Sequence, residues 1–373
     1  MTDNAPSRSV PARRDLAVAI ATFGMTEGPR FPRAPLDAEA WAHLMTDVSS
    51  QRLLGLADAA ITAGFPVTEP QATDVRRAAE AQAIDCLALD TMLVGLADEF
   101  DRVGIDFRVL KGPGVARRFY ARIEWRPYGD IDLLVRPDQW DRAAAHLVEL
   151  GCVRRFDEPR AGFTARFGKG ASFVTPSNYE VDLHRTFVAG PHGLAFDPNL
   201  LFTSPVTFDV GGRTLPMLSD VHGAIHVGMH AILGSAAPRW IPLRDCIQIV
   251  RSGLEVDDLV SAAADLGARW PLALALRHAH RDLAIPIDSA IEQWGNDYRP
   301  TAREARAAEV YRSTDQRYSR QALAGLRAIP TWRARAEYAA ALALPDPAYR
   351  RRREQSLVGR LRLSARLARR ARP

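Results

Sequence analysis

Gly129-Asp130-Ile131-Asp132-Leu133-Leu134-Val135 is the stretch that decides the fold of this chain. Side chains in a β-strand alternate between its two faces, so Asp130 and Asp132 project together from one side of an otherwise apolar strand. Two carboxylates placed in this way repel each other unless a cation lies between them. The stretch therefore predicts a strand that carries a metal site.

A second predicted strand, 105–110, runs directly into Lys111-Gly112-Pro113-Gly114. Proline suits the first turn of a helix, and the glycine before it lets backbone N–H groups come close to a ligand. A phosphate would fit at such a helix start. Lys111 and Lys169 are also the only two lysines among 49 basic residues. The use of lysine where the chain otherwise has arginine indicates that a compact ammonium is needed at Lys111 rather than a planar guanidinium.

A further acidic strand contains Glu180-Val181-Asp182-Leu183-His184. Its two acids and its histidine alternate onto one face, while the two residues between them face the core. Asp182 is the predicted third acid of the site, and Glu180 is the rival for that role. Lys169, in the turn Gly168-Lys169-Gly170, would be a second phosphate contact or simply part of a hairpin turn, and we assign it no site role.

The segment from Val109 to Val135 resembles the nucleotidyltransferase superfamily of DNA polymerase beta, whose members carry a glycine-containing strand-to-helix turn, an Asp-x-Asp strand and a third acid. Together with Val181-Asp182-Leu183-His184, it is most similar to the bacterial uncharacterised nucleotidyltransferase family. The similarity extends from about Trp41 through the C-terminal tail. Lys111-Gly112 replaces the usual Gly-Ser of the turn, so no serine hydroxyl is assigned to the phosphates.

This resemblance implies an enzyme that moves a nucleotide (NMP) from a nucleoside triphosphate to an acceptor hydroxyl or phosphate and releases pyrophosphate. ATP is favoured as the donor because it is abundant. Two Mg²⁺ (or Mn²⁺) ions would neutralise the phosphoryl charge, and the expected ligands and catalytic residues are Asp130, Asp132 and Asp182. The third acid would help activate the acceptor or bind the second metal. Phosphate or nucleotide contacts are expected from Lys111, Gly112, Arg126, His184, His226 and His230.

Three histidines, His222, His226 and His230, recur at every fourth residue and would form one stripe on a helix. No glutamate follows His222, which excludes a metalloprotease zinc helix. The stripe either lines the nucleotide cleft, with His226 and His230 favoured, or packs in the core. Asp245 matches a recurrent acid of the family and would orient a histidine or pair with Arg244.

The predicted fold class is α+β, with a mixed-sheet nucleotidyltransferase core flanked by N-terminal and C-terminal helical regions. The predicted segments are a flexible leader (1–14), a helical cap (15–102), the nucleotidyltransferase catalytic core (103–216), a helical substrate- and nucleotide-binding region (217–345) and a basic amphipathic tail (346–373). One helix is expected at about 137–150. The candidate strands are 105–110, 130–135, 152–156, 163–168, 171–175, 179–186 and 206–210.

The net charge of +5 comes from the tail, because residues 350–373 hold ten arginines and one acid while the rest of the chain is slightly acidic. The tail would contact an acidic partner or lie against the body with its arginines in solvent. No apolar run approaches the roughly 20 residues of a membrane span, and no signal-peptide core is present. The expected location is therefore the cytoplasm. Three widely spaced cysteines give neither a disulfide framework nor a zinc signature.

Two alternatives to an enzyme acting on a small molecule or a natural-product peptide stay open. One is a catalytically silent nucleotide-binding or regulatory protein of the same fold. The intact Asp130, Asp132 and Asp182 favour the enzyme, because burying uncompensated acids costs stability. The other is an RNA-directed nucleotidyltransferase toxin, and the arginine-rich tail supports this alternative. The acidic body makes it less favoured, since RNA grooves usually run through a basic cleft.

Overall fold

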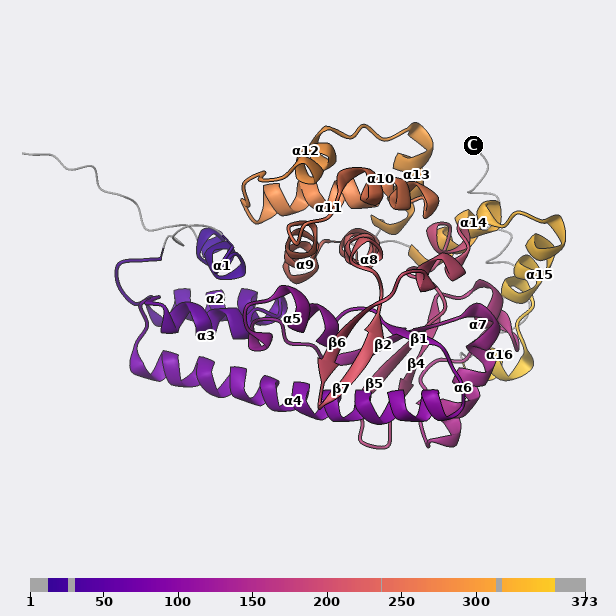
Figure 1. Ribbon diagram of the computed structural model, residues 1–373, viewed down its shortest axis with the longest axis horizontal. Coiled ribbons are helices and arrows are strands. Elements are labelled where there is room, and N and C mark those ends of the chain that lie inside the picture. Colours follow the sequence, from indigo (N-terminus) through magenta and orange to yellow (C-terminus); the bar gives the residue numbers. More distant parts are fainter. Residues whose placement is uncertain (1–12, 26–30, 236, 313–316, 353–373) are drawn as a thin grey trace, which may run out of the picture.

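The computed structural model describes residues 13–25, 31–235, 237–312 and 317–352. Figure 1 shows a mixed sheet between two helical layers, and the sheet has seven strands in the order β3-β4-β5-β2-β1-β7-β6. The pairs β2/β5 and β1/β7 are parallel and the other neighbours are antiparallel. The strands are β1 (Phe107–Val109), β2 (Asp130–Val135), β3 (Val153–Arg154), β4 (Gly170–Val174), β5 (Glu180–His184), β6 (Val206–Val210) and β7 (Arg213–Met217).

Of the N-terminal helices, α4 lies below the sheet in Figure 1 and runs along its whole width, while α1, α2 and α3 lie to the left of the sheet. Helix α4 begins with a capping box between Thr68 and Gln71, and its 34 residues extend over roughly 50 Å. Its buried face includes Leu89, Leu93 and Phe100. These helices are α1 (Arg13–Ala21), α2 (Ala38–Ser50), α3 (Leu54–Thr62) and α4 (Glu69–Arg102).

The C-terminal helices lie mostly on the opposite side of the sheet (Figure 1). Helices α8 and α11 approach closely at Gly228, where an added Cβ would lie 3.1 Å from the side chain of Leu272. The helices are α8 (Asp220–Leu233), α9 (Trp240–Val250), α10 (Val256–Asp265), α11 (Arg269–Asp282), α12 (Ala290–Asp297), α13 (Ala302–Arg312), α14 (Arg317–Ala328), α15 (Trp332–Ala343) and α16 (Pro347–Arg352).

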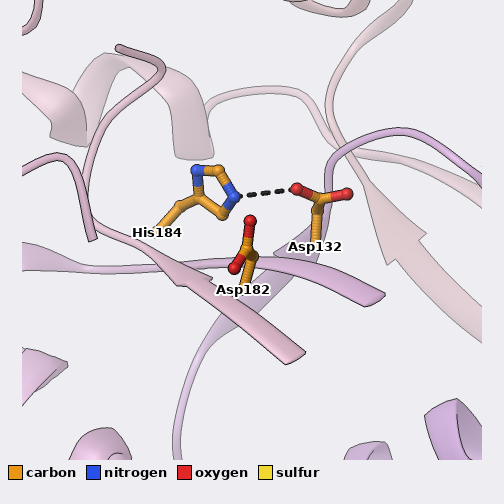
Figure 2. Close-up of side chains that lie close together, drawn as sticks. All are labelled: Asp132, Asp182 and His184. Carbon is orange, nitrogen blue, oxygen red and sulfur yellow. Dashed lines mark hydrogen bonds and ion pairs between the residues drawn. The ribbon is translucent and has the colours of Figure 1, made fainter. Parts of the chain in front are cut away.

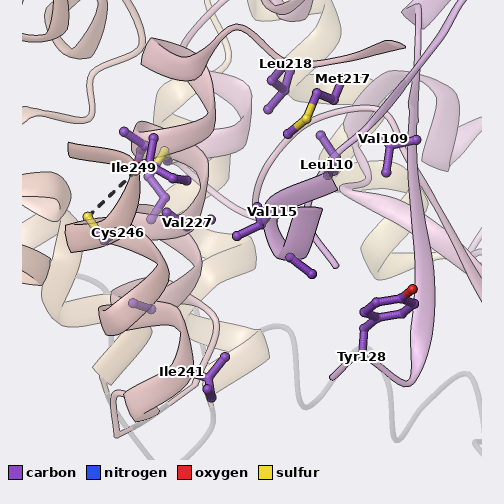
Figure 3. Packing of buried hydrophobic residues seen from close by; sticks show 14 of the residues in the cluster. Val109, Leu110, Val115, Tyr128, Met217, Leu218, Val227, Ile241, Cys246 and Ile249 are labelled. Atoms are coloured by element: carbon purple, nitrogen blue, oxygen red, sulfur yellow. Dashed lines mark hydrogen bonds between the residues drawn. The ribbon is translucent and has the colours of Figure 1, made fainter. Parts of the chain in front are cut away.

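The sheet and the C-terminal helices share one hydrophobic core. Figure 3 shows Leu110 and Val115, from the turn and short helix α5 (Pro113–Phe119), beside the helices that carry Val227 and Ile249. All four side chains are buried. Burial of apolar surface contributes about 25 cal/mol per Å², so this shared core holds α8 over the sheet.

The predicted α+β class and most of the predicted elements are confirmed. The helix expected at about 137–150 is the 3₁₀ turn η2 (Pro137–Gln139) followed by α6 (Trp140–Glu149). The strand predicted at 163–168 is wrong, because this segment forms the helix α7 (Phe163–Phe167). The helix places two phenylalanines four residues apart against Tyr338, with ring centroids 5.6 and 5.3 Å away. Strand β7 was not predicted, because a proline such as Pro216 within a run of residues argues against a strand.

Several predictions about the ends of the chain fall outside the described residues, namely those for residues 1–12 of the leader and 353–373 of the tail. Of the predicted tail, 346–373, the described residues include only 346–352, the segment that contains α16. Within the described residues, no helix combines the length and the apolar character needed to cross a membrane. The three cysteines are free thiols.

Candidate active site

The acids of the two central strands share one face of the sheet. Strands β2 and β5 are parallel and in register, with Asp130 opposite Glu180 and Asp132 opposite Asp182. Residues directly opposite in a parallel pair project to the same side. Figure 2 shows the side chains of Asp132, Asp182 and His184 gathered together, and one possible ligand atom from each lies within 4.8 Å of the others.

Lys111 supplies the cation that the paired aspartates require. It follows β1, whose end is fixed to β2 by a hydrogen bond from the Leu110 N–H to the carbonyl of Asp132. The Lys111 ammonium lies 2.5 Å from Asp132 Oδ2 and 3.5 Å from Asp130 Oδ2. Burial by itself would lower the pKa of Lys111, but the charges of Asp132 and Asp130 raise it above its usual value. Lys111 is therefore a firmly charged ammonium.

Asp132 is the most enclosed of the three acids, with 4% of its surface exposed. Burial opposes its ionisation, but the charge of Lys111 and the hydrogen bond from His184 hold its pKa well below the usual range. His184 Nε2 lies 2.9 Å from Asp132 Oδ1, and the buried Nδ1 of His184 has no hydrogen-bond partner in the described part of the chain. Asp132 is thus a buried carboxylate with a cationic and an imidazole neighbour.

Asp182 and Glu180, the two rivals for the third acid, have different surroundings. Asp182 belongs to the Asp132–His184 cluster and accepts a hydrogen bond from the hydroxyl of Ser172 on β4. Glu180 pairs at 2.7 Å with Arg155, whose side chain is about half exposed. The geometry therefore groups Asp182, rather than Glu180, with Asp132.

The predicted phosphate turn depends on glycine and is supported from α4. Gly112 has φ +58° and ψ −115°, a backbone conformation that L side chains rarely adopt. An added Cβ would also lie 3.4 Å from Tyr128. Tyr128 donates its hydroxyl hydrogen to Asp90 of α4 at 2.5 Å, and Arg117 of α5 donates to the same carboxylate. Helix α4 thereby fixes both sides of the turn.

Arg126 is buried in an ion pair. Its guanidinium donates to both oxygens of Asp245, at 2.7 Å from Nη2 and 3.2 Å from Nε. The hydroxyl of Tyr120 donates to Asp245 at 2.7 Å. Arg244, one predicted partner of Asp245, instead donates to the backbone carbonyl of Ala21. A contact between Arg126 and phosphate stays a prediction.

His226 and His230 lie next to each other on α8, with ring centroids 6.3 Å apart. His226 packs against Phe187, and its Nδ1 has no hydrogen-bond partner among the described residues. Burial, followed by the charge of His184, lowers the pKa of His226 well below its usual value, and burial with Lys111 does the same for His230. Both rings are neutral at pH 7, and their contact with a nucleotide stays a prediction.

Lys169, for which the sequence predicted no site role, lies beside this cluster. It lines a cavity of about 260 Å³ together with Asp182 and His184. Asp132 and Asp182 both act on its charge. The one signal in the sequence was its rarity, because the chain has only two lysines and the other is Lys111 of the cluster. Ser172, the hydrogen-bond donor to Asp182, carried no such signal.

Comparisons with known proteins show the family of the chain. The family model described as "Uncharacterised nucleotidyltransferase" matches residues 37–283. No curated protein matches the chain. Among solved structures, an antigenic nucleotidyltransferase-like protein from Paracoccidioides brasiliensis is similar, with 14% identity and a TM-score of 0.34. That match covers 54% of this chain and 94% of the other.

Proposed function

Because this chain belongs to the uncharacterised nucleotidyltransferase family, we propose that it transfers a nucleotide (NMP) from a nucleoside triphosphate to an acceptor hydroxyl or phosphate and releases pyrophosphate. The family predicted from three short motifs is thus confirmed. The observation that carries the proposal is the cluster of Asp132, Asp182 and His184, in which one ligand atom from each residue lies within 4.8 Å of the others.

The donor set suits a divalent cation. Carboxylate oxygens are the ligands that Mg²⁺ and Mn²⁺ prefer, and the depressed pKa of Asp132 keeps that acid ionised. We assign metal binding to Asp130, Asp132 and Asp182. A bound Mg²⁺ or Mn²⁺ would neutralise the negative charge that builds up on the phosphates during transfer. Lys111 pairs with two of these carboxylates, Asp132 and Asp130.

The nucleotide is assigned to the Lys111 side of the cluster. A lysine ammonium binds phosphate as a point charge, and Gly112 leaves the backbone of the turn free of a side chain. Arg126 adds positive charge close to Asp130, while its ion pair with Asp245 anchors the loop before β2 to α9. The favoured donor is ATP.

The acceptor is assigned to the Asp182 side. Asp182 and His184 line the cavity of about 260 Å³, so an acceptor hydroxyl placed there would lie next to a carboxylate. A carboxylate within hydrogen-bond reach can accept the proton of the attacking hydroxyl. The acceptor we favour is a small molecule or a natural-product peptide.

Label transfer tests this proposal. The purified chain is incubated with each α-labelled nucleoside triphosphate and Mg²⁺ or Mn²⁺, against peptide, RNA and metabolite fractions of the host. We expect label in one fraction, a loss of about a hundredfold or more in Asp132→Asn, and no change in Asp138→Asn, whose side chain is exposed in η2. Equal transfer by Asp132→Asn and wild type would overturn the assignment.

One observation favours a second function, a nucleotide-binding protein without turnover. Lys111 already compensates Asp132 at 2.5 Å, so the acids have a structural reason to persist without catalysis. In that case the chain would bind a metal-nucleotide complex, and no fraction would be labelled.

A further inference from the structure

We propose that Lys169 anchors a second anion site, which holds a phosphate group of the acceptor while the acceptor hydroxyl faces Asp182. This inference rests on the proposed function and narrows the acceptor to a small molecule that carries a phosphate. It is separate from the Lys111 side, to which the donor nucleotide is assigned.

The two lysines of the chain are engaged in different ways. Lys111 is bound to Asp132 and Asp130. The ammonium of Lys169 makes no hydrogen bond and no ion pair with any residue that the structure describes, although Asp132 and Asp182 are close enough to act on its charge. A partly buried ammonium without a partner is costly, and an anionic ligand would compensate it.

The other charged side chains of the cavity are already engaged. Arg154 donates to the hydroxyl of Thr164 and to the carbonyl of Phe156. Glu158 accepts hydrogen bonds from the backbone N–H groups of Gly162 and Thr164. Lys169 is therefore the cation that the cavity leaves available to a ligand, and Asp182 is the acid beside it.

The backbone holds Lys169 in a fixed place. Its carbonyl accepts hydrogen bonds from the N–H groups of Arg185 and Thr186, just after β5. At Gly170 an added Cβ would lie 2.1 Å from the carbonyl oxygen of Leu183, so only glycine allows this close approach. Burial lowers the pKa of Lys169, against the pull of Asp132 and Asp182. A fixed backbone at this position lowers the ordering cost of binding a ligand.

The size of the cavity limits the ligand. Its volume of about 260 Å³ lies below the roughly 300–1,000 Å³ of sites for drug-sized ligands. Phe163 contributes an aromatic wall. A small phosphate monoester with a free hydroxyl fits this combination, whereas a nucleic-acid strand would need a longer groove.

The chain's two lysines make a direct test possible. Full-length protein labelled biosynthetically with ¹³C-lysine gives two Cε signals, which the variant Lys169→Arg assigns. Glycerol phosphate is titrated as the probe, glycerol as its uncharged control, and a non-hydrolysable nucleoside triphosphate with Mg²⁺ as a separate arm. We expect glycerol phosphate to shift the Lys169 signal saturably and glycerol to leave it unchanged. The triphosphate should shift the Lys111 signal.

Calorimetry of glycerol phosphate binding supplies the second measurement. Lys169→Gln should weaken the affinity at least tenfold, while Arg166→Gln, which removes an exposed cation of α7, should not. If glycerol phosphate shifts only Lys111 or neither lysine, or if Lys169→Gln binds it like wild type, the inference is overturned. If the inference fails in this way but the triphosphate still shifts the Lys111 signal, the proposed function stands without a phosphate site at Lys169. An unmoved Lys111 counts against the proposed function instead.

Discussion

One ammonium, that of Lys111, pairs with both Asp132 and Asp130. We predict that Lys111→Met destabilises the protein by about 3–5 kcal/mol, because removing one partner leaves buried charge uncompensated. Added Mg²⁺ should restore part of this loss if the acids bind it. Urea unfolding with and without Mg²⁺ measures both effects. A variant as stable as wild type in the absence of Mg²⁺ would show that Lys111 does not compensate the acids.

The buried pair of Arg126 and Asp245 gives a second residue-scale prediction. Asp245→Asn should cost about 3–5 kcal/mol of unfolding free energy, since it strands a buried guanidinium. As the control, Asp101→Asn removes one partner of a much more exposed ion pair with Arg213 and should cost less than about 1 kcal/mol. Equal losses in the two variants would contradict the structural importance of the buried pair.

The buried side chain of His192 should make the stability of the protein depend on pH. Burial lowers its pKa from 6.5 to about 4, against the hydrogen bond with Gly267 and the charge of Glu304. The folded pKa lies below the unfolded one, so the stabilisation is complete above pH 6.5 and is lost as the pH falls towards 4. The loss amounts to about 3 kcal/mol. His192→Gln should flatten the fall in stability over this range, and an unchanged slope would refute the assignment.

At the scale of elements, two glycines should respond in opposite directions to alanine. Gly95 is exposed in the interior of α4, towards its C-terminal end, and an added Cβ there would meet nothing within 4 Å, so Gly95→Ala should stabilise the protein by about 0.5–1 kcal/mol. Gly170→Ala should destabilise it and weaken the pairing of β4 with β5, because its Cβ would collide with the Leu183 carbonyl. The unfolding temperatures of both variants measure these effects. Stabilisation by Gly170→Ala would contradict the described packing.

The elements also show what the sequence could and could not predict. Strand alternation placed Asp130, Asp132, Asp182 and His184 on one face correctly, because that rule is local. The helix α7 was missed, since its conformation depends on a contact with Tyr338, far along the chain. Lys169 was left out because its glycine neighbours read as a turn, and only the pairing of β4 with β5 brings it to the acids.

At the scale of the whole molecule, helix α15 supports the wall of the cavity that Asp182 lines. Tyr338 packs on both phenylalanines of α7, and the loop before α7 bonds to the segment after α15, through Arg160 to the Leu344 carbonyl. This segment lies beyond the residues 37–283 that the family model matches. All the residues that line the cavity lie within the family-matched region, and α15 packs behind the cavity wall from outside that region.

We predict that Tyr338→Ala loosens this wall without unfolding the sheet. Limited proteolysis should then cut within residues 156–168 at least several times faster than in wild type, because local opening exposes the backbone. Trp332→Ala is the control, since Trp332 is 80% exposed on the same helix and should leave the rate unchanged. Equal cleavage rates in Tyr338→Ala and wild type would contradict the supporting role of α15.

The central claim is that the acids of β2 and β5 hold a divalent cation together with a nucleoside triphosphate. Mn²⁺ binding, measured by electron paramagnetic resonance with a non-hydrolysable triphosphate, tests it most directly. We predict binding by wild type and Asp138→Asn, and an affinity at least tenfold weaker in Asp132→Asn and in Asp182→Asn. Mn²⁺ binding by both site variants with the affinity of wild type would contradict the account.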